Sequence, residues 1–170
     1  VDLVMPDMAG EAIAAEVAAP STFRVIENLL AKSAGVLLWA DAALAGTDTI
    51  TLGDGNNIAV GGGAADSITT GSGNDIALGD NGRVAFDSAG FVTFVTTTDS
   101  AVGSGDTLSL GAGNNIAFGG AGNDIVTTGD GRDLIVGDNG NATFDASSHL
   151  LIDIRTSNTA DACLDTITAG

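Results

Sequence analysis

The sequence predicts an all-β solenoid, and three observations support this fold class. An aspartate or asparagine recurs every nine residues over two long stretches of the chain. A longer block, which contains these nine-residue repeats, itself recurs along the chain. The composition includes 25 glycines but only six phenylalanines, one tryptophan and no tyrosine. Few large core residues and many glycines favour thin packing between short strands that are joined by tight turns.

The longer repeat divides the chain into units. Residues 79–82 (Gly-Asp-Asn-Gly) return as residues 137–140, 58 positions later. The triplet that begins at Asp48 returns, as Asp-Thr-Ile or Asp-Thr-Leu, at Asp106 and Asp165. We therefore expect an N-terminal segment (1–46), a first unit (47–105), a second unit (106–164) and the start of a third (165–170).

The shorter repeat predicts the strands and turns inside each unit. Its marker residues lie nine positions apart: Asp48, Asn57, Asp66 and Asp75 in the first unit, and Asp106, Asn115, Asp124 and Asp133 in the second. Nine residues fit neither a helical period nor a heptad. They suit a turn of about six residues followed by a strand of about three.

The strand residues predict two unlike faces. Triplets with a central isoleucine between polar residues, such as those around Ile50 and Ile68, alternate with triplets that have a central alanine, such as those around Ala59 and Ala77. We expect one sheet to bury the isoleucines and the other to bury the alanines. The second sheet then presents Ile58, Val60, Ile76 and Leu78 on its outer face, and an apolar face of this kind needs a cover.

Two inserts without nonapeptides are candidates for that cover. Residues 84–97 and 142–156 each read as strand, turn and strand, so each is expected to fold over the apolar sheet or to extend it. A ligand-binding role for these hairpins is the alternative. Residues 28–46 resemble the first insert, so we interpret them as the hairpin of a degenerate preceding unit, with Trp39 packing where Phe94 does.

The segment from Gly119 to Thr127 (Gly-Gly-Ala-Gly-Asn-Asp-Ile-Val-Thr) resembles the RTX, or haemolysin-type, nonapeptide G-G-x-G-x-D-x-U-x. Residues 129–135 and 71–75 match this pattern nearly as well. The resemblance implies a parallel β-roll in which two nonapeptides make one turn and calcium lies between stacked turns. Asn57 and Asn115 depart from the pattern, because asparagine offers a carbonyl oxygen but no charge.

Calcium prefers six to eight hard oxygen ligands in flexible geometry. Glycines let backbone carbonyls turn toward one point, and one aspartate per turn adds charge. With turns of 18 residues, Asp48, Asp66 and Asp80 are expected to stack at one edge. Asp106, Asp124 and Asp138 are expected to share one edge in the second unit. The candidate ligands are Asp48, Asp54, Asn57, Asp66, Asp75, Asp80, Asp106, Asn115, Asp124, Asp130, Asp133, Asp138 and Asp165. The alternative is that these aspartates only cap turns.

Charge excludes several partners. The 22 acidic and five basic residues give a formal net charge of −17, so nucleic acid and anionic membrane surfaces are poor partners. No stretch reaches the roughly 18 apolar residues of a membrane span. The single cysteine, Cys163, forms no disulfide within the chain, and we interpret the lone histidine, His149, as a surface residue.

These features predict a calcium-binding structural module of a secreted, surface-associated protein. The module is expected to act as a spacer, as in an adhesin, to fold on calcium binding outside the cell, and not to be an enzyme. One alternative is a subunit that associates head to tail into an extracellular filament through open β-ends. Another is the non-catalytic RTX region of a secreted enzyme or toxin. The chain is expected to be part of something longer.

Overall fold

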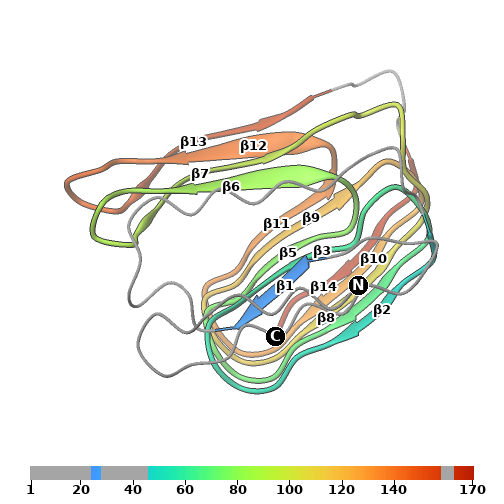
Figure 1. Cartoon of the computed structure of the whole chain (residues 1–170), viewed down its shortest axis with the longest axis horizontal. Coiled ribbons are helices and arrows are strands. Elements are labelled where there is room, and N and C mark those ends of the chain that lie inside the picture. Colours follow the sequence, from blue (N-terminus) through green and yellow to red (C-terminus); the bar gives the residue numbers. More distant parts are fainter. Residues whose placement is uncertain (1–23, 28–45, 158–162) are drawn as a thin grey trace.

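The computed structural model describes residues 24–27, 46–157 and 163–170, and the regular elements within these ranges are all strands. They form three sheets (Figure 1). This confirms the all-β prediction. The described part of the chain holds no helix long and apolar enough to cross a membrane. The predicted hairpin at 28–46, with Trp39, lies almost wholly outside the described residues, as does most of the N-terminal segment 1–46.

Sheet 1 is built from the triplets with a central large apolar residue. Its strands are β2 (Thr49–Thr51), β4 (Ser67–Thr69), β8 (Thr107–Leu110), β10 (Ile125–Thr128) and β14 (Thr166–Thr168). They lie in that order and all pair in parallel. The register stacks Ile50 on Ile68, Ile68 on Leu108 and Leu108 on Val126, so one side of sheet 1 is a continuous apolar file.

Sheet 2 is built from the triplets with a central small residue. Its strands β3 (Asn57–Val60), β5 (Ile76–Leu78), β9 (Ile116–Gly120) and β11 (Leu134–Asp138) also pair in parallel. A further strand, β1 (Arg24–Glu27), pairs antiparallel with β3 at the edge of this sheet. Along the chain, successive parallel strands belong alternately to sheet 1 and sheet 2, as a β-roll requires.

The windings continue without a break across the first insert. Ile68 pairs with Leu108 in sheet 1 and Ala77 pairs with Ala117 in sheet 2, although each pair is 40 residues apart in the sequence. The chain therefore leaves the roll after β5, forms a hairpin, and returns to add the next winding where an uninterrupted repeat would have placed it. The two units form one continuous stack.

Sheet 3 contains the two hairpins. Strands β6 (Gly82–Phe86) and β7 (Val92–Thr97) form the first, and β12 (Gly140–Phe144) and β13 (Leu151–Thr156) form the second. Strands β7 and β12 also pair, so the order is β13-β12-β7-β6, entirely antiparallel. Figure 1 shows this sheet lying over sheet 2 as a third layer.

Two apolar clusters result, as the strand patterns predict. Inside the roll, Ile50 and Ile68 of sheet 1 pack with Ala59, Ala77 and their equivalents from sheet 2. Outside sheet 2, its outward side chains pack under sheet 3: Ile58, Val60, Ile76, Leu78, Phe118 and Val136 lie with Val84, Val95 and Ala142. The expected burial of both faces is confirmed, and the hairpins cover the apolar face and do not extend it.

The tips of the two hairpins contact each other through His149. Its ring stacks on Phe91, with centroids 3.7 Å apart and planes 18° from parallel. Its Nε2 lies 3.5 Å from an Oδ of Asp87, whose other oxygen accepts hydrogen bonds from Ala89 and Phe91. His149 is exposed, and its role in this structure is to join one tip to the other.

Candidate functional site

The turns bring the nine-residue markers into two columns on opposite edges of the roll. One column, the aspartate edge, precedes the strands of sheet 1: Asp48, Asp66, Asp106, Asp124 and Asp165. The other, the amide edge, lies where the strands of sheet 2 begin: Asn57, Asp75, Asn115 and Asp133. The separation follows from the period, because each winding holds two nonapeptides and alternate markers fall on alternate edges.

Each aspartate after Asp48 on the aspartate edge accepts a backbone hydrogen bond from the preceding winding with one oxygen. The backbone N–H groups of Asp48, Asp66 and Asp106 donate to the Oδ1 atoms of the next aspartate in the column, each at 2.7 Å. The N–H of Asp124 donates to Oδ1 of Asp165 at 2.9 Å. The rung that follows Asp66 is therefore Asp106, 40 residues on. The predicted order, with Asp80 as the next rung, is wrong because the first insert leaves the stack.

The second oxygen of these carboxylates is left without a partner. The Oδ2 atoms of Asp66, Asp106 and Asp124 are buried and accept no hydrogen bond. Burial without a partner is costly for a polar atom and more so for a charged one. Three such oxygens, repeated at the same place in successive windings, indicate a ligand of positive charge.

Glycines leave the space next to these oxygens open. A Cβ built on Gly61 lies 2.5 Å from Oδ2 of Asp66 and 2.2 Å from the carbonyl oxygen of Gly79. On Gly119 it lies 2.4 Å from Oδ2 of Asp124 and 2.1 Å from the carbonyl oxygen of Gly137. Any side chain larger than hydrogen would therefore fill a niche where a carboxylate oxygen and a carbonyl oxygen approach each other. Oxygen ligands of these two kinds are what calcium prefers.

Asp80 and Asp138 add carboxylates to the same edge from the ends of sheet 2 strands. The N–H of Ala121 donates to Oδ2 of Asp80 at 2.5 Å, while its Oδ1 is buried without a partner. Oδ1 of Asp138 is also buried and has no hydrogen-bond partner. Asp80 lies close enough to Asp66, Asp106 and Asp124 for their charges to interact. Both residues therefore lie on the predicted edge, beside the column and not within it.

The family comparison agrees with this geometry. Residues 43–77 and 102–144 match the family model of the RTX calcium-binding nonapeptide repeat in four copies. These residues are RTX repeats. No curated protein and no solved structure matches the chain significantly. RTX nonapeptide repeats bind calcium, and the buried oxygens without partners are of the kind that calcium prefers.

The RTX repeats offer each ion few side chains. Among the described residues, no three acidic, histidine or cysteine side chains converge on a single point. An ion at this edge would therefore be held by carboxylates from one or two windings together with backbone carbonyls. Calcium tolerates such a mixed and flexible shell, whereas magnesium demands near-ideal octahedral geometry at shorter distances.

Burial raises the pKa of the carboxyl groups at this edge in the metal-free RTX repeats. The pKa is raised to about 6 for Asp66 and Asp124, about 7 for Asp80 and about 9 for Asp106, in each case mainly by burial. Hydrogen bonds from backbone N–H groups oppose the rise, and the charges of neighbouring aspartates add to it. These carboxylates repel one another unless a cation lies between them.

These pKa values predict how pH acts on calcium binding. Because the folded-state pKa values lie above the value of about 3.8 for an exposed aspartate, the metal-free fold is most stable in acid and loses stability as pH rises toward 9. Calcium requires the ionised form, so its affinity should rise over the same interval and binding should release protons. Calcium titrations at pH 5.5 and pH 8 in two buffers of different ionisation enthalpy measure both effects. Equal affinity at the two pH values would contradict the prediction.

The amide edge has the same ladder of backbone bonds but no orphaned carboxylate oxygen. The N–H groups of Asn57, Asp75 and Asn115 donate to the Oδ1 atoms of the next residue in the column at 2.8, 3.0 and 2.9 Å. Asp54 and Asp130, also predicted as ligands, lie outside both columns and are exposed. Oδ1 of Asp54 accepts a hydrogen bond from the N–H of Ser72.

The residues five positions before each marker also shape the site, and the nine-residue pattern did not point to them. On the amide edge this position is Leu52, Thr70, Leu110 and Thr128. The Thr70 hydroxyl donates to Oδ2 of Asp75 at 2.8 Å and so satisfies the oxygen that is left free on the other edge. Before Asp66 and Asp124 the same position is glycine. Threonine at this position before an aspartate, and leucine before an asparagine, is the signal in the sequence. Only Thr70 is seen in this role, because the Thr128 hydroxyl before Asp133 is buried without a partner.

Proposed function

We propose that the chain is a non-catalytic, calcium-dependent structural module of a secreted, surface-associated protein, where it acts as a spacer. The observation that carries the proposal is the column of buried carboxylate oxygens without partners on the aspartate edge. A column of this kind is unfavourable in the absence of a cation and favourable in its presence. The module is therefore expected to be ordered where calcium is abundant and disordered where calcium is scarce.

The overall charge supports coupling between folding and calcium binding. The net charge of −17 favours an expanded chain through self-repulsion, and the small aromatic content limits the apolar core that opposes it. Binding sites of calcium between windings do not exist in the unfolded chain, so the binding free energy adds to the folding free energy. Extracellular calcium-binding modules have dissociation constants of about 0.1–1 mM, which suits the calcium levels outside cells.

Circular dichroism with and without calcium tests this function. In chelator we expect a largely disordered spectrum, and in millimolar calcium a gain of β-signal that millimolar magnesium does not reproduce. Asp106→Ala removes the most central carboxylate of the column and should raise the calcium concentration at the midpoint by more than roughly tenfold, since even the loss of residues that only support a ligand costs 10–100-fold. The matched control is Asp130→Ala, which removes the same charge from an exposed position. A β-spectrum unaffected by chelator would refute the proposal.

Self-association is a second candidate function, and the exposed edge of sheet 3 favours it. Among the described strands, β13 pairs with β12 alone, and its side chains Leu151, Ile152 and Ile154 are exposed. An apolar edge strand is a template for pairing with another chain. At the opposite end of the roll β1 covers the edge of β3, which opposes simple head-to-tail stacking on sheet 2. Sedimentation velocity in calcium at two protein concentrations distinguishes a monomeric spacer from an assembling subunit.

A further inference from the structure

We infer that calcium closes only one edge of the roll, and that the side-chain amides of Asn57 and Asn115 close the other edge in place of an ion. This inference rests on the proposed calcium-dependent fold and specifies which windings need the metal. On this inference, a turn with aspartate at the nine-residue marker can bind calcium, and a turn with asparagine there does not need it.

Asn57 carries the inference, because three acceptor oxygens share the two N–H donors of its side-chain amide. Its Nδ2 donates to the carbonyl oxygen of Gly53 at 2.9 Å, to that of Gly55 at 3.0 Å and to Oδ1 of Asp75 at 3.0 Å. The residue is only 1% exposed. Two carbonyls from its own turn and a carboxylate from the neighbouring winding thus meet at an N–H₂ group. Carbonyl and carboxylate oxygens are the ligands that calcium takes.

Asn115 repeats the two bonds to backbone carbonyls, without the bond to a carboxylate, two windings further on. Its Nδ2 donates to the carbonyl oxygens of Gly111 and Gly113 at 3.0 and 3.4 Å, and its Oδ1 accepts the N–H of Asp75. The carbonyls again lie four and two residues before the marker. The same local sequence pattern therefore forms the same closure twice, so the bonds at Asn57 are a property of the repeat and not of one turn.

The carboxylate between the two asparagines has its hydrogen bonds without a metal ion. Oδ1 of Asp75 accepts from the backbone and the side chain of Asn57, and Oδ2 accepts from the Thr70 hydroxyl. None of the four marker side chains of the amide edge has a buried atom without a partner, whereas Asp66, Asp106 and Asp124 each do. The contrast separates the two edges chemically, although the backbone ladders are alike.

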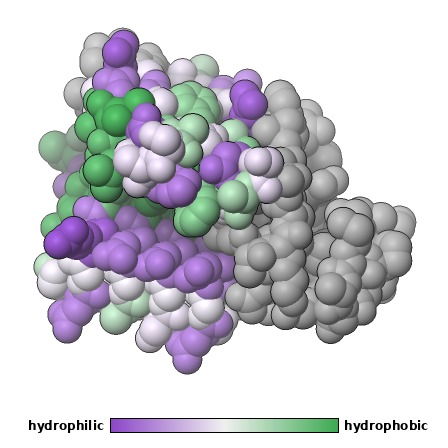
Figure 2. All heavy atoms as spheres, turned by 90° about the vertical axis from the view of Figure 1, so that its left-hand side faces the viewer, coloured by the Kyte–Doolittle hydropathy of each residue, from purple (hydrophilic) through white to green (hydrophobic). Residues whose placement is uncertain are grey.

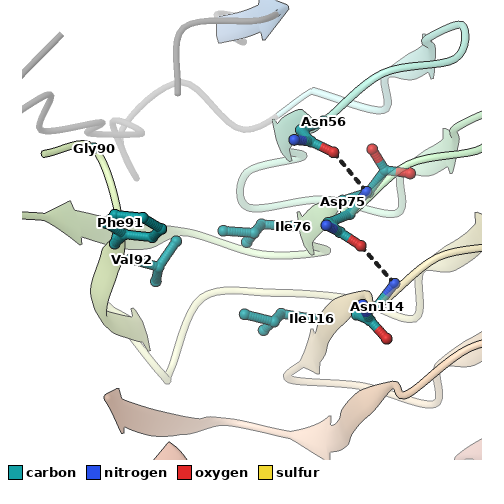
Figure 3. Close-up of a pocket in the computed structure, with 9 residues that line it drawn as sticks. Asn56, Asp75, Ile76, Gly90, Phe91, Val92, Asn114 and Ile116 are labelled. Carbon is teal, nitrogen blue, oxygen red and sulfur yellow. Dashed lines mark hydrogen bonds between the residues drawn. The ribbon is translucent and has the colours of Figure 1, made fainter. Parts of the chain in front are cut away.

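A second ladder outside the first reinforces the amide edge. The N–H of Asn74 donates to Oδ1 of Asn56, and that of Asn114 donates to Oδ1 of Asn74, each at 2.8 Å. Figure 3 shows these two bonds, which link Asn56 to Asn114 through the residue between them, and it shows the hairpin residue Phe91 on the opposite side of the pocket. Figure 2, which faces this side of the molecule, shows a row of hydrophilic residues below the apolar region of the hairpins. An outer ladder of neutral amides thus lies beside an inner column in which amides and carboxylates alternate.

Closure of a turn by asparagine does not depend on the calcium concentration, whereas closure by an ion does. The amide supplies two N–H donors at no charge, so the turn closes as soon as the chain folds and at any calcium concentration. An aspartate at the same position has no donor, and its charge faces carbonyl and carboxylate oxygens until a cation arrives. The roll should therefore bind fewer ions than its count of nonapeptides suggests, and all of them on the aspartate edge.

The test replaces the two marker asparagines with aspartates, which removes the amide donors and adds carboxylates. The double variant Asn57→Asp and Asn115→Asp should bind more calcium ions per chain than the wild type, by equilibrium dialysis at saturating calcium, and should lose more β-structure in chelator. The matched control, Asn56→Asp with Asn114→Asp, adds the same two charges to the exposed outer ladder while keeping its acceptor oxygens, and should leave the ion count unchanged. An unchanged count in the first variant, or an equal increase in the control, would overturn the inference.

The reverse change covers the case in which the first variant does not fold even in calcium. Asp124→Asn introduces an amide four and two residues after Gly120 and Gly122, whose carbonyls could accept its N–H groups as those of Gly53 and Gly55 do for Asn57. We therefore expect a folded chain that binds fewer ions than the wild type. An ion count equal to that of the wild type would overturn the inference. If the wild type itself binds no calcium, the proposed function fails, and that result is distinct from all of these.

Discussion

Replacing Phe118 with alanine is expected to destabilise the folded protein by about 3–5 kcal/mol, the usual cost of removing a fully buried phenylalanine. Phe118 lies on β9, is fully buried, and packs in the cluster between sheet 2 and the hairpins. A Cβ placed on Gly140 of the second hairpin lies 3.3 Å from its ring, so the hairpin sheet closes directly on it. The cavity left by alanine would lie at the interface between two layers.

Chemical denaturation in saturating calcium measures this loss, because calcium holds the metal sites constant between variants. The matched control is Phe91→Ala at the exposed tip of the first hairpin, where 48% of the residue is exposed. Its loss should remain below about 1 kcal/mol, because it fills no buried space. Similar losses for the two variants would contradict the packing of sheet 3 on sheet 2.

The second large effect is expected at Gly113, where two successive windings lie very close together. Its φ is +146°, and a Cβ at this position lies 1.8 Å from the carbonyl oxygen of Gly73 in the winding below. Alanine therefore combines backbone strain, worth about 1–3 kcal/mol, with overpacking against backbone, worth a further 1–3 kcal/mol or so. We expect Gly113→Ala to lower the free energy of unfolding by about 2–6 kcal/mol.

Gly53→Ala is the control for this prediction. Gly53 belongs to an equivalent turn and its carbonyl accepts the Asn57 amide, but no atom lies within 4 Å of a Cβ placed on it. Its φ is not in the left-handed region. The substitution should therefore change stability by no more than about 0.5 kcal/mol, as exposed substitutions usually do. Equal effects at Gly53 and Gly113 would mean that stacked windings are not in contact at the glycines.

Local chemistry made the repeat architecture predictable. A strand of three residues has one central side chain on the inner face, so Ile50 and Ala59 alone indicate which side of each triplet is buried. The marker spacing of nine then determines that successive markers occupy opposite edges. The need for a cover also followed from the sequence, because Ile58, Val60, Ile76 and Leu78 formed an apolar face that water would otherwise contact. The sequence left open whether the inserts cover this face or extend its sheet, and the structure shows that they cover it.

The spacing of the markers did not predict that one edge has carboxylate oxygens without partners and the other does not. All 13 candidate ligands were chosen because they carry a side-chain oxygen at or near a turn. Whether that oxygen is free depends on donors from other windings: the N–H of Asn57 and the hydroxyl of Thr70 satisfy Asp75, while no donor reaches Oδ2 of Asp66. The order of the rungs also depends on the insert, which places Asp106 next to Asp66.

By itself, then, the sequence determined the short strands, the turns between them, the faces that they bury and the family of calcium-binding repeats to which they belong, because each of these depends on residues a few positions apart. Only the tertiary structure decided which windings are neighbours, how the hairpins seal sheet 2, and which carboxylates keep an oxygen for an ion. These depend on contacts between residues 18 to 41 positions apart, where the number of residues that loop out, and not the repeat, sets which groups meet.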